Sequence, residues 1–225
     1  MRFLHWLSLV VLLASPLAFV RAADPAATKS ALEADPTGWK DLLTDKELKD
    51  WKRVPIPAGG KLKEKNPWGV EKELLVCAGK GAGHEMLLFN EEFGDGIFHV
   101  EWRFKPVENG KGYNSGVYVR NSADGAVWHQ AQVGNKNVGY IFGDTLTDGQ
   151  KKRMNVKDAA VPQRGKEAGE WNVFEITCKG KEMTLWVNGA VTARWTDCQV
   201  PKGHVGLEAE GWDIEFRNVK FRGVK

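Results

Sequence analysis

Side chains able to bind hydroxyls recur on one face of several short runs of this sequence. Counting in twos along each run separates an apolar face from a second face. That second face combines carboxylates, guanidinium groups, amides and aromatic rings: Glu101, Arg103, Tyr118, Arg120, Gln130, Gln132, Trp186, Glu208 and Glu210. One amide or guanidinium group can hydrogen-bond to two neighbouring hydroxyls of a sugar at once. An aromatic ring fits the apolar face of a pyranose. The set predicts a carbohydrate groove, although outer faces of sheets are also polar simply because they are wet.

The runs that present these side chains read as strands, and turn residues separate them. A tight hairpin turn is predicted at Asn188-Gly189, because this dipeptide suits the positive φ angles of a type I′ turn. A helical turn is possible within 41–50, and no long segment has a helical period. Many antiparallel strands at this spacing favour an all-β sandwich or barrel. The main predicted strands are Lys72–Ala78, Met86–Asn90, Ile97–Pro106, Ser115–Asn121, Val127–Gly134, Asn172–Lys179, Met183–Val187, His204–Ala209 and Ile214–Phe221.

The first residues resemble a secretory signal peptide. Arg2 precedes a short apolar run, and small residues precede a cleavage site after Ala22. The alternative is a membrane anchor, but the apolar run falls short of the roughly 20 residues that a bilayer span needs. We therefore expect a signal peptide over 1–22, a flexible lead-in over 23–37 and a single β-sandwich domain over 38–225. The protein is expected to be secreted or periplasmic, with no membrane span after cleavage.

The composition of the chain limits the classes of partner and cofactor that the protein is expected to bind. The net charge is +3 for 225 residues, and basic and acidic residues are interspersed, so no basic stripe predicts nucleic-acid binding. The three cysteines, Cys77, Cys178 and Cys198, are too few for a disulfide framework. Cys178 and Cys198 could pair, or they could be ordinary buried thiols. Nothing like a zinc or EF-hand motif is present, so no cofactor is identified, and a divalent cation remains possible.

Motifs spread along the chain in a fixed order resemble the 3-keto-disaccharide hydrolase family. The most specific is Asn114–Arg120, NSGVYVR, which matches the signature N-S-G-hydrophobic-aromatic-x-R. The others are Gly38-Trp39 with Trp51, Phe98–Arg103 (FHVEWR), Gly169–Asn172 (GEWN), Trp186–Gly189 (WVNG), and Gly203–Leu207 followed by Glu210-Gly211 and Ile214–Val219. The resemblance runs from Gly38 almost to the C-terminus.

The resemblance implies a two-sheet antiparallel jelly roll, similar to the concanavalin A-like lectins and glucanases. It also implies cleavage of glycosides already oxidised to a ketone at C3. Such a ketone acidifies the C2 proton, so a base can remove it and the C1 leaving group can be expelled before water adds back. The reaction needs one base, a donor or cation at the enolate oxygen, and an acid for the leaving oxygen. Direct glycoside hydrolysis instead needs two carboxylates at a set separation.

Within that chemistry we expect Arg120 to contact a substrate oxygen or the enolate, unless it pairs with Glu101. Glu210 is the best acid–base candidate, and the alternative is a solvated or arginine-paired carboxylate. Glu208 completes the predicted catalytic set, and Gln132 would bind hydroxyls. The predicted substrate-binding residues are Glu101, Arg103, Tyr118, Gln130, Gln132 and Trp186.

This chain departs from the family pattern at two positions. Gln130 replaces an expected glutamate, and an amide cannot act as a base. Glu208 replaces an expected glutamine, which could relocate a carboxylate within the same groove. His129 is expected to be buried by alternation, whereas His84 and His99 have no partner spacing that supports catalysis or metal binding.

Three functions stay open on the sequence. The first is an exported carbohydrate-active hydrolase that cleaves 3-keto-glycosides by elimination and hydration. The second is a non-catalytic carbohydrate-binding module of the same fold, which Gln130 favours. The third is a structural domain that uses the polar face to contact a protein.

Overall fold

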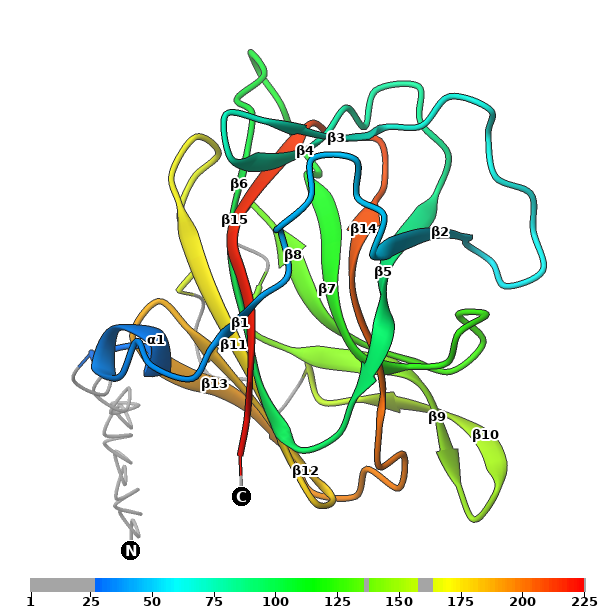
Figure 1. Ribbon diagram of the computed structural model, residues 1–225, viewed down its shortest axis with the longest axis vertical. Coiled ribbons are helices and arrows are strands. Elements are labelled where there is room, and N and C mark those ends of the chain that lie inside the picture. The colour runs from blue at the N-terminus through cyan, green and yellow to red at the C-terminus, as the bar shows by residue number, and fades with distance from the viewer. Residues whose placement is uncertain (1–26, 136–137, 158–163, 225) are drawn as a thin grey trace, which may run out of the picture.

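The computed structural model describes residues 27–135, 138–157 and 164–224, and these form a β-sandwich (Figure 1). One short helix, α1 (Ala31–Ala34), precedes the strands in the described part of the chain. The strands are β1 (Lys40–Asp41), β2 (Trp51–Pro55), β3 (Trp68–Glu71), β4 (Leu74–Cys77), β5 (Glu85–Phe93), β6 (Gly96–Phe104), β7 (Asn114–Asn121), β8 (Trp128–Gly134), β9 (Ile141–Thr147), β10 (Gln150–Asn155), β11 (Asn172–Lys179), β12 (Glu182–Val187), β13 (Ala190–Trp195), β14 (Gly203–Ala209) and β15 (Ile214–Gly223).

The strands form two antiparallel sheets that lie face to face. Sheet A has the order β13-β12-β11-β6-β15-β4-β3, with β1 added along β15. Sheet B has the order β10-β9-β8-β7-β14-β5-β2. Neighbouring strands such as β7 and β14 come from distant parts of the chain, which is typical of a jelly roll. The predicted all-β, two-sheet fold is confirmed.

The core lies between the sheets, where the predicted apolar faces meet. Val100 and Trp102 of sheet A and Val117 and Leu207 of sheet B are at most 1% exposed. Burying each such side chain contributes about 1.5–3 kcal/mol, so alternation along the strands decides which faces meet. The Asn188-Gly189 turn is also confirmed, with φ of 42° and 112°.

Two local predictions are wrong. The segment 41–50 forms no helix, because its aspartates bond to nearby backbone N–H groups, as Asp45 does with Glu47 N at 2.9 Å. The lead-in is bound to sheet A at the start of α1, although residues 33–37 are exposed. There the Glu175 carboxylate accepts hydrogen bonds from the backbone of Ala31 at 2.7 Å and Leu32 at 3.1 Å. A buried acceptor on sheet A thus holds the start of α1.

The signal-peptide prediction lies outside the described residues. Among the residues that are described, no helix is long and apolar enough to cross a membrane.

Candidate functional site

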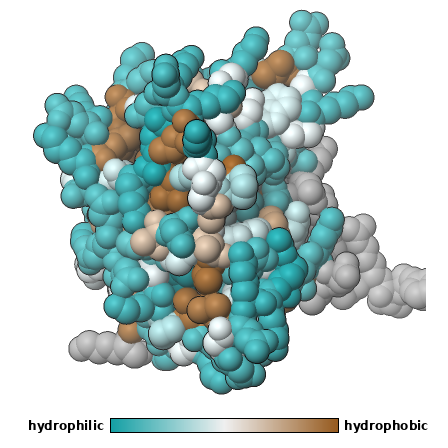
Figure 2. Space-filling model, turned by 90° about the vertical axis from the view of Figure 1, so that its right-hand side faces the viewer, coloured by the Kyte–Doolittle hydropathy of each residue, from teal (hydrophilic) through white to brown (hydrophobic). Residues whose placement is uncertain are grey.

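A cleft of about 410 Å³ lies on the outer face of sheet B, within the size range of ligand sites. Strands β5, β7, β8, β9, β10 and β14 supply its lining, together with residues just after β2 and β14, just before β5 and between β7 and β8. Figure 2 views the molecule from the side on which β2, β9 and β10 lie in Figure 1, and pale and brown residues form a band down its middle. The cleft therefore combines polar groups with an apolar surface.

Glu208 is the centre of the polar end. Its Oε1 lies 2.8 Å from His84 Nε2 and accepts a hydrogen bond from the Tyr118 hydroxyl at 2.8 Å. Its Oε2 accepts a hydrogen bond from Gln130 Nε2 at 3.0 Å. Glu208 is only 3% exposed, and a buried carboxylate needs such donors to stay charged. The three contacts fix this carboxylate in one position.

Glu210 lies beside this centre and is more open to the cleft. Its Oε2 is 3.8 Å from His84 Nε2, and it accepts a hydrogen bond from the Asn114 amide. The Gln132 amide in turn donates to Asn114 Oδ1 at 2.6 Å. The alternation of β14 places Glu208 and Glu210 on one face, as predicted, so two carboxylates share one corner of the cleft.

Gly116 makes this arrangement possible. A Cβ at this position would lie 2.4 Å from Gln130 Nε2 and 2.5 Å from Gln130 Cδ. The side chain of Gln130 therefore crosses β7 through the space that a side chain at 116 would fill. The glycine of the NSG motif is thus explained by the contact between Gln130 and Glu208.

The close charges shift the pKa values of the groups around Glu208. The hydrogen bond to Glu208 raises the pKa of His84, and the charges of Glu208 and Glu210 add to the effect. Burial raises the pKa of Glu210, and the charge of Glu208 raises it further. Burial also raises the pKa of Tyr118 well above its ordinary value, again with help from Glu208. Such displaced pKa values are typical of sites that transfer protons.

The same corner has the donor set of a cation site. One nitrogen of His84 and one oxygen each of Glu208 and Glu210 lie within 4.8 Å of one another. The nitrogen lies 2.8 Å from the Glu208 oxygen and 3.8 Å from the Glu210 oxygen, and both separations suit ligands about 2.0–2.2 Å from a common ion. An imidazole with two carboxylates suits several divalent metals. The residues therefore fit a divalent cation.

The structure brings five of the predicted site residues together. Two are the carboxylates predicted to be catalytic, and three were predicted to bind substrate. They are Glu208, Glu210, Tyr118, Gln130 and Gln132, and all line the cleft.

The placement predicted for Arg120 is wrong. Along β7 and β14, Tyr118 pairs with Gly206 and Asn121 pairs with His204, so β7 holds one extra residue between the two pairs. Such a bulge changes the phase of the strand, and Arg120 has φ of 50°. Its side chain consequently lies inside the protein, 1% exposed, and does not line the cleft.

Arg120 has partners of its own in that buried position. It donates to Asp95 Oδ1 at 2.8 Å, to the Gly180 carbonyl at 2.9 Å and to Cys198 Sγ at 3.5 Å. Glu101, the partner considered from the sequence, is not among these contacts. Arg120 therefore ties sheet B to the hairpin that follows β11.

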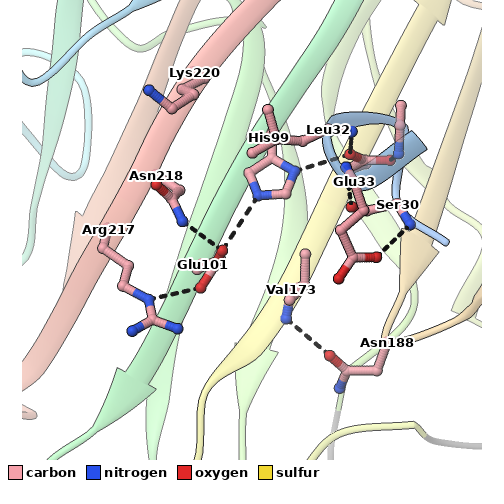
Figure 3. A network of polar contacts seen from close by, with 12 residues as sticks. Ser30, Leu32, Glu33, His99, Glu101, Val173, Asn188, Arg217, Asn218 and Lys220 are labelled. Atoms are coloured by element: carbon pink, nitrogen blue, oxygen red, sulfur yellow. Dashed lines mark hydrogen bonds and ion pairs between the residues drawn. The ribbon is translucent and has the colours of Figure 1, made fainter. Parts of the chain in front are cut away.

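Glu101, Arg103 and Trp186 belong to sheet A, not to the cleft. Counting in twos identifies the outer face of a strand but not the sheet to which the strand belongs, so these residues were grouped with the wrong surface. Glu101 accepts hydrogen bonds from Arg217 at 2.7 Å and Asn218 at 2.6 Å, as Figure 3 shows. Arg103 donates to another glutamate of sheet A, and Trp186 donates to Thr28.

Other titratable groups that the sequence raised are structural. His129 is fully buried, as expected, and burial lowers its pKa to about 4. His99 lies in the sheet A network, 2.8 Å from the Glu175 carboxylate (Figure 3). Cys178 and Cys198 are both buried free thiols, so the possible disulfide is not formed.

Sequence reasoning left out several residues of the cleft. His84 had no recognisable partner spacing, because Glu208 lies 124 positions away. Asn114 belongs to the NSG motif but was given no role. The hairpin β9–β10 was not predicted at all, so its contributions to the lining were missed: Phe142, Asp144, Lys151 and Arg153.

Three solved structures of similar fold have descriptions that name a glycosyl hydrolase, a glucanase or a carbohydrate-binding module. A putative glycosyl hydrolase from Parabacteroides distasonis is 16% identical, with a TM-score of 0.58 over 89% of this chain and 100% of that one. A β-1,3-1,4-glucanase from a mouse hindgut metagenome is 11% identical, with a TM-score of 0.55 over 83% and 98%. Carbohydrate binding module CBM66 from Bacillus subtilis is 14% identical, with a TM-score of 0.54 over 76% and 93%. At these identities the likeness shows the fold.

A search of curated proteins finds no match. The family of 3-keto-alpha-glucoside-1,2-lyase-like domains matches residues 38–222, which include every residue that lines the cleft. This chain belongs to that family.

Proposed function

We propose that this protein cleaves 3-keto-glycosides in the cleft of sheet B, by elimination across C1–C2 followed by addition of water. The observation that supports this most directly is the cluster of His84, Glu208 and Glu210, with atoms 2.8 Å and 3.8 Å apart. These residues offer two groups that can exchange protons and one fixed charge beside them. Elimination from a ketone needs that combination.

The first step removes the proton on C2, which the C3 ketone makes acidic. Glu210 is suited to accept it, because burial and the charge of Glu208 raise its pKa and make its carboxylate a stronger base. The electron pair left on C2 forms the enolate, the C1–O bond breaks, and the double bond lies between C1 and C2.

The leaving oxygen needs a proton as the C1–O bond breaks. His84 is suited to donate it, because Glu208 favours the protonated imidazole and holds the ring in place. Water then adds at C1 of the unsaturated ketone and a proton returns to C2, so the net reaction is hydrolysis. Glu208 acts in this scheme as a positioning residue.

The enolate oxygen also needs a positive charge or a hydrogen-bond donor. Arg120 does not line the cleft, so it is not proposed for this role. The protonated His84 places a positive charge in the same corner. A divalent cation held by His84, Glu208 and Glu210 would replace the proton on His84 and supply a Lewis acid in the place of that acid.

The amide groups of Asn114, Gln130 and Gln132 line the polar end and are suited to bind the hydroxyls of the keto sugar. Gln130 donates to Glu208 and Asn114 donates to Glu210, while Gln132 donates to Asn114. Substrate hydroxyls bound there would lie next to the proton-transfer groups.

A carbohydrate-binding module is the second candidate. This candidate is favoured by the surroundings of Glu208, which is only 3% exposed. Its carboxylate already accepts hydrogen bonds from Tyr118 and Gln130 and contacts His84, so its oxygens are occupied by neighbouring side chains. The deciding experiment incubates the purified protein with a 3-keto disaccharide and follows the release of free sugar. Release supports the lyase–hydrolase proposal, whereas binding of the substrate without release supports the module.

We also propose that the protein is exported and cleaved after Ala22. The sequence pattern of residues 1–22 supports this. Mass spectrometry of the mature protein, recovered from the medium or periplasm of an expressing bacterium, should give an N-terminus at Ala23. A full-length chain retained in the cell would contradict the proposal.

A further inference from the structure

The cleft has a second end that the proposed reaction does not use. There the lining changes from amides and carboxylates to carbon surface. The residues of this apolar end are Met86, Gly125, Ala126, Trp128 and Phe142. Three further apolar residues, Ile56, Pro57 and Ala58, continue the carbon surface toward the polar end, where Ile56 N donates to the His84 carbonyl at 2.9 Å.

The apolar end lies over a hydrophobic cluster that is separate from the core between the sheets. Val54, Met86, Leu88 and Tyr118 form this cluster, and Trp128 and Ile56 pack against it. Outer faces of antiparallel sheets are ordinarily polar because water covers them. An apolar surface that lines a cleft indicates an apolar occupant.

The wall around this end is held in a defined shape. In the loop between β7 and β8, Ser122 N donates to the Val127 carbonyl at 2.9 Å, and Ser122 Oγ accepts from Val127 N at 2.9 Å. Gly125 of the same loop has φ of 73°, and a Cβ there would lie 3.2 Å from Val54 Cγ1. The loop therefore rests closely on the cluster and needs no rearrangement to form the wall.

Aromatic rings form the corner between the two ends. The Trp128 ring lies 6.2 Å from Tyr118 at an interplanar angle of 84°, and 5.3 Å from Phe142 at 88°. The guanidinium of Arg153 lies 5.0 Å from the Trp128 ring centroid and is bound by Asp144 at 2.9 Å. Tyr118 also donates to Glu208, so the aromatic corner is joined directly to the proposed catalytic cluster.

The apolar end is poorly matched to a second sugar. A pyranose can place its apolar face on an aromatic ring, but the hydroxyls around its edge also need partners, and each hydroxyl buried without one costs about 1–3 kcal/mol. The ionic groups nearest this end, Asp144 with Lys151 and Arg153, are paired with each other at 3.3 Å and 2.9 Å. A planar apolar ring, by contrast, gains from burial and from edge-to-face contact with Trp128 and Phe142.

We propose that the apolar end is the subsite for the leaving group, and that it takes an aromatic aglycone in preference to a second sugar. This inference rests on the proposed function, because it places the keto sugar among the amides and carboxylates of the polar end. The aglycone ring then lies against Trp128, Phe142 and Met86, and its oxygen faces His84.

The first test compares three substrates, the 3-keto derivatives of benzyl, methyl and glucosyl α-glucosides. Benzyl alcohol is no better a leaving group than a sugar hydroxyl, so a higher kcat/KM for the benzyl compound reports binding of the ring. We expect the order benzyl, then glucosyl, then methyl. A disaccharide turned over as efficiently as the benzyl substrate would overturn the inference.

The second test replaces the aromatic corner. Trp128→Leu and Phe142→Leu should each lower kcat/KM for the benzyl substrate by about tenfold and leave the methyl substrate nearly unchanged. Trp171 lies just before β11, and its ring contacts the guanidinium groups of Arg103 and Arg217 on sheet A at 4.6 Å and 4.1 Å. Trp171→Leu is therefore a matched change away from the cleft and should affect neither substrate. Equal losses on the benzyl and methyl substrates would show that the rings support the fold of the site and would overturn the inference.

Binding without turnover separates this inference from the proposed function. Unoxidised benzyl and methyl α-glucosides are titrated into the full chain by calorimetry. Tighter binding of the benzyl compound that Trp128→Leu abolishes supports the aromatic subsite even if no 3-keto-glycoside is cleaved. Equal affinities would overturn the subsite even if cleavage occurs.

Discussion

His84 Nε2 lies 2.8 Å from Glu208 Oε1, although 124 positions separate the two residues in the sequence. The pair joins the residue just before β5 to the next-to-last residue of β14. The two strands are hydrogen-bonded neighbours in sheet B. Because Tyr118 and Gln130 bind the same carboxylate, a change at Glu208 reaches the whole polar end of the cleft.

Glu208→Gln should lower kcat/KM on a 3-keto-glycoside by at least about a hundredfold. This is the usual contribution of a positioned proton-transfer group, here His84, which Glu208 holds in place. The amide keeps the size of the side chain but removes the charge that favours protonated His84. Glu215→Gln, which removes a carboxylate that binds Arg103 on sheet A, is the matched control and should retain activity. Turnover by a folded Glu208→Gln protein within a few fold of the wild type would contradict the mechanism.

The pKa of His84 should be measurably above its ordinary value of about 6.5. If the protonated ring is the acid, kcat/KM falls as the pH rises through this raised pKa. An NMR titration of the His84 ring and a pH–rate profile should give the same midpoint, and Glu208→Gln should move both to lower pH. A midpoint at or below the ordinary value would argue against His84 as the acid.

Gly116→Ala should damage the cleft more than the fold. A Cβ at 116 would lie 2.4 Å from Gln130 Nε2, so Gln130 must move away from Glu208. Gly69→Ala provides the control, since the nearest atom to a Cβ there is Val76 Cγ2 at 3.8 Å. We expect a large loss of turnover in the first variant and wild-type turnover in the second, with melting temperatures to monitor folding. Normal activity of Gly116→Ala would mean that the contact between Gln130 and Glu208 is dispensable.

A divalent cation at His84, Glu208 and Glu210 should compete with the proton on His84. After treatment with EDTA, titration with MnCl2 in a calorimeter should show one site whose affinity falls as the pH is lowered. His84→Ala should abolish this binding, whereas His99→Ala on sheet A should not. If the wild type gives no heat of binding, the site does not hold the cation, and protonated His84 is then the positive charge that the mechanism uses.

Arg120→Met should lower stability and spare substrate binding. The buried guanidinium binds Asp95 at 2.8 Å and the Gly180 carbonyl at 2.9 Å, and losing hydrogen bonds to a charged group costs about 1.5–3 kcal/mol. Denaturant unfolding should show this loss, and KM for a 3-keto-glycoside should stay close to the wild-type value. A large increase in KM in a stable protein would restore the catalytic role predicted from the sequence.

The sequence predicted the sandwich because alternation and turn residues act locally. Val117 is buried and Asn188 adopts positive φ, as their neighbours in the sequence imply. Glu208 and Glu210 were predicted together because they lie two positions apart on one strand. Alternation does not indicate which sheet a strand joins, so Glu101 and Trp186 were grouped with a cleft on the opposite sheet.

The remaining differences arise from contacts between distant residues. His84 acquires its role only because β5 pairs with β14. Glu175 binds the backbone of Ala31 across 144 positions, so the start of α1 is held in place where composition predicted flexibility. Neither relationship leaves a pattern within a short window of sequence.

The extra residue in β7 determines where this strand can carry a charge. Tyr118 on one side of the bulge lines the cleft, Val119 packs in the core between the sheets, and Arg120 lies buried beyond them. A deletion of Val119 would remove the bulge and put Arg120 next to Tyr118, where strict alternation points its side chain into the core position of Val119. The guanidinium would then lie among apolar side chains and away from Asp95, so the bulge is the device that lets a core strand end in a paired cation.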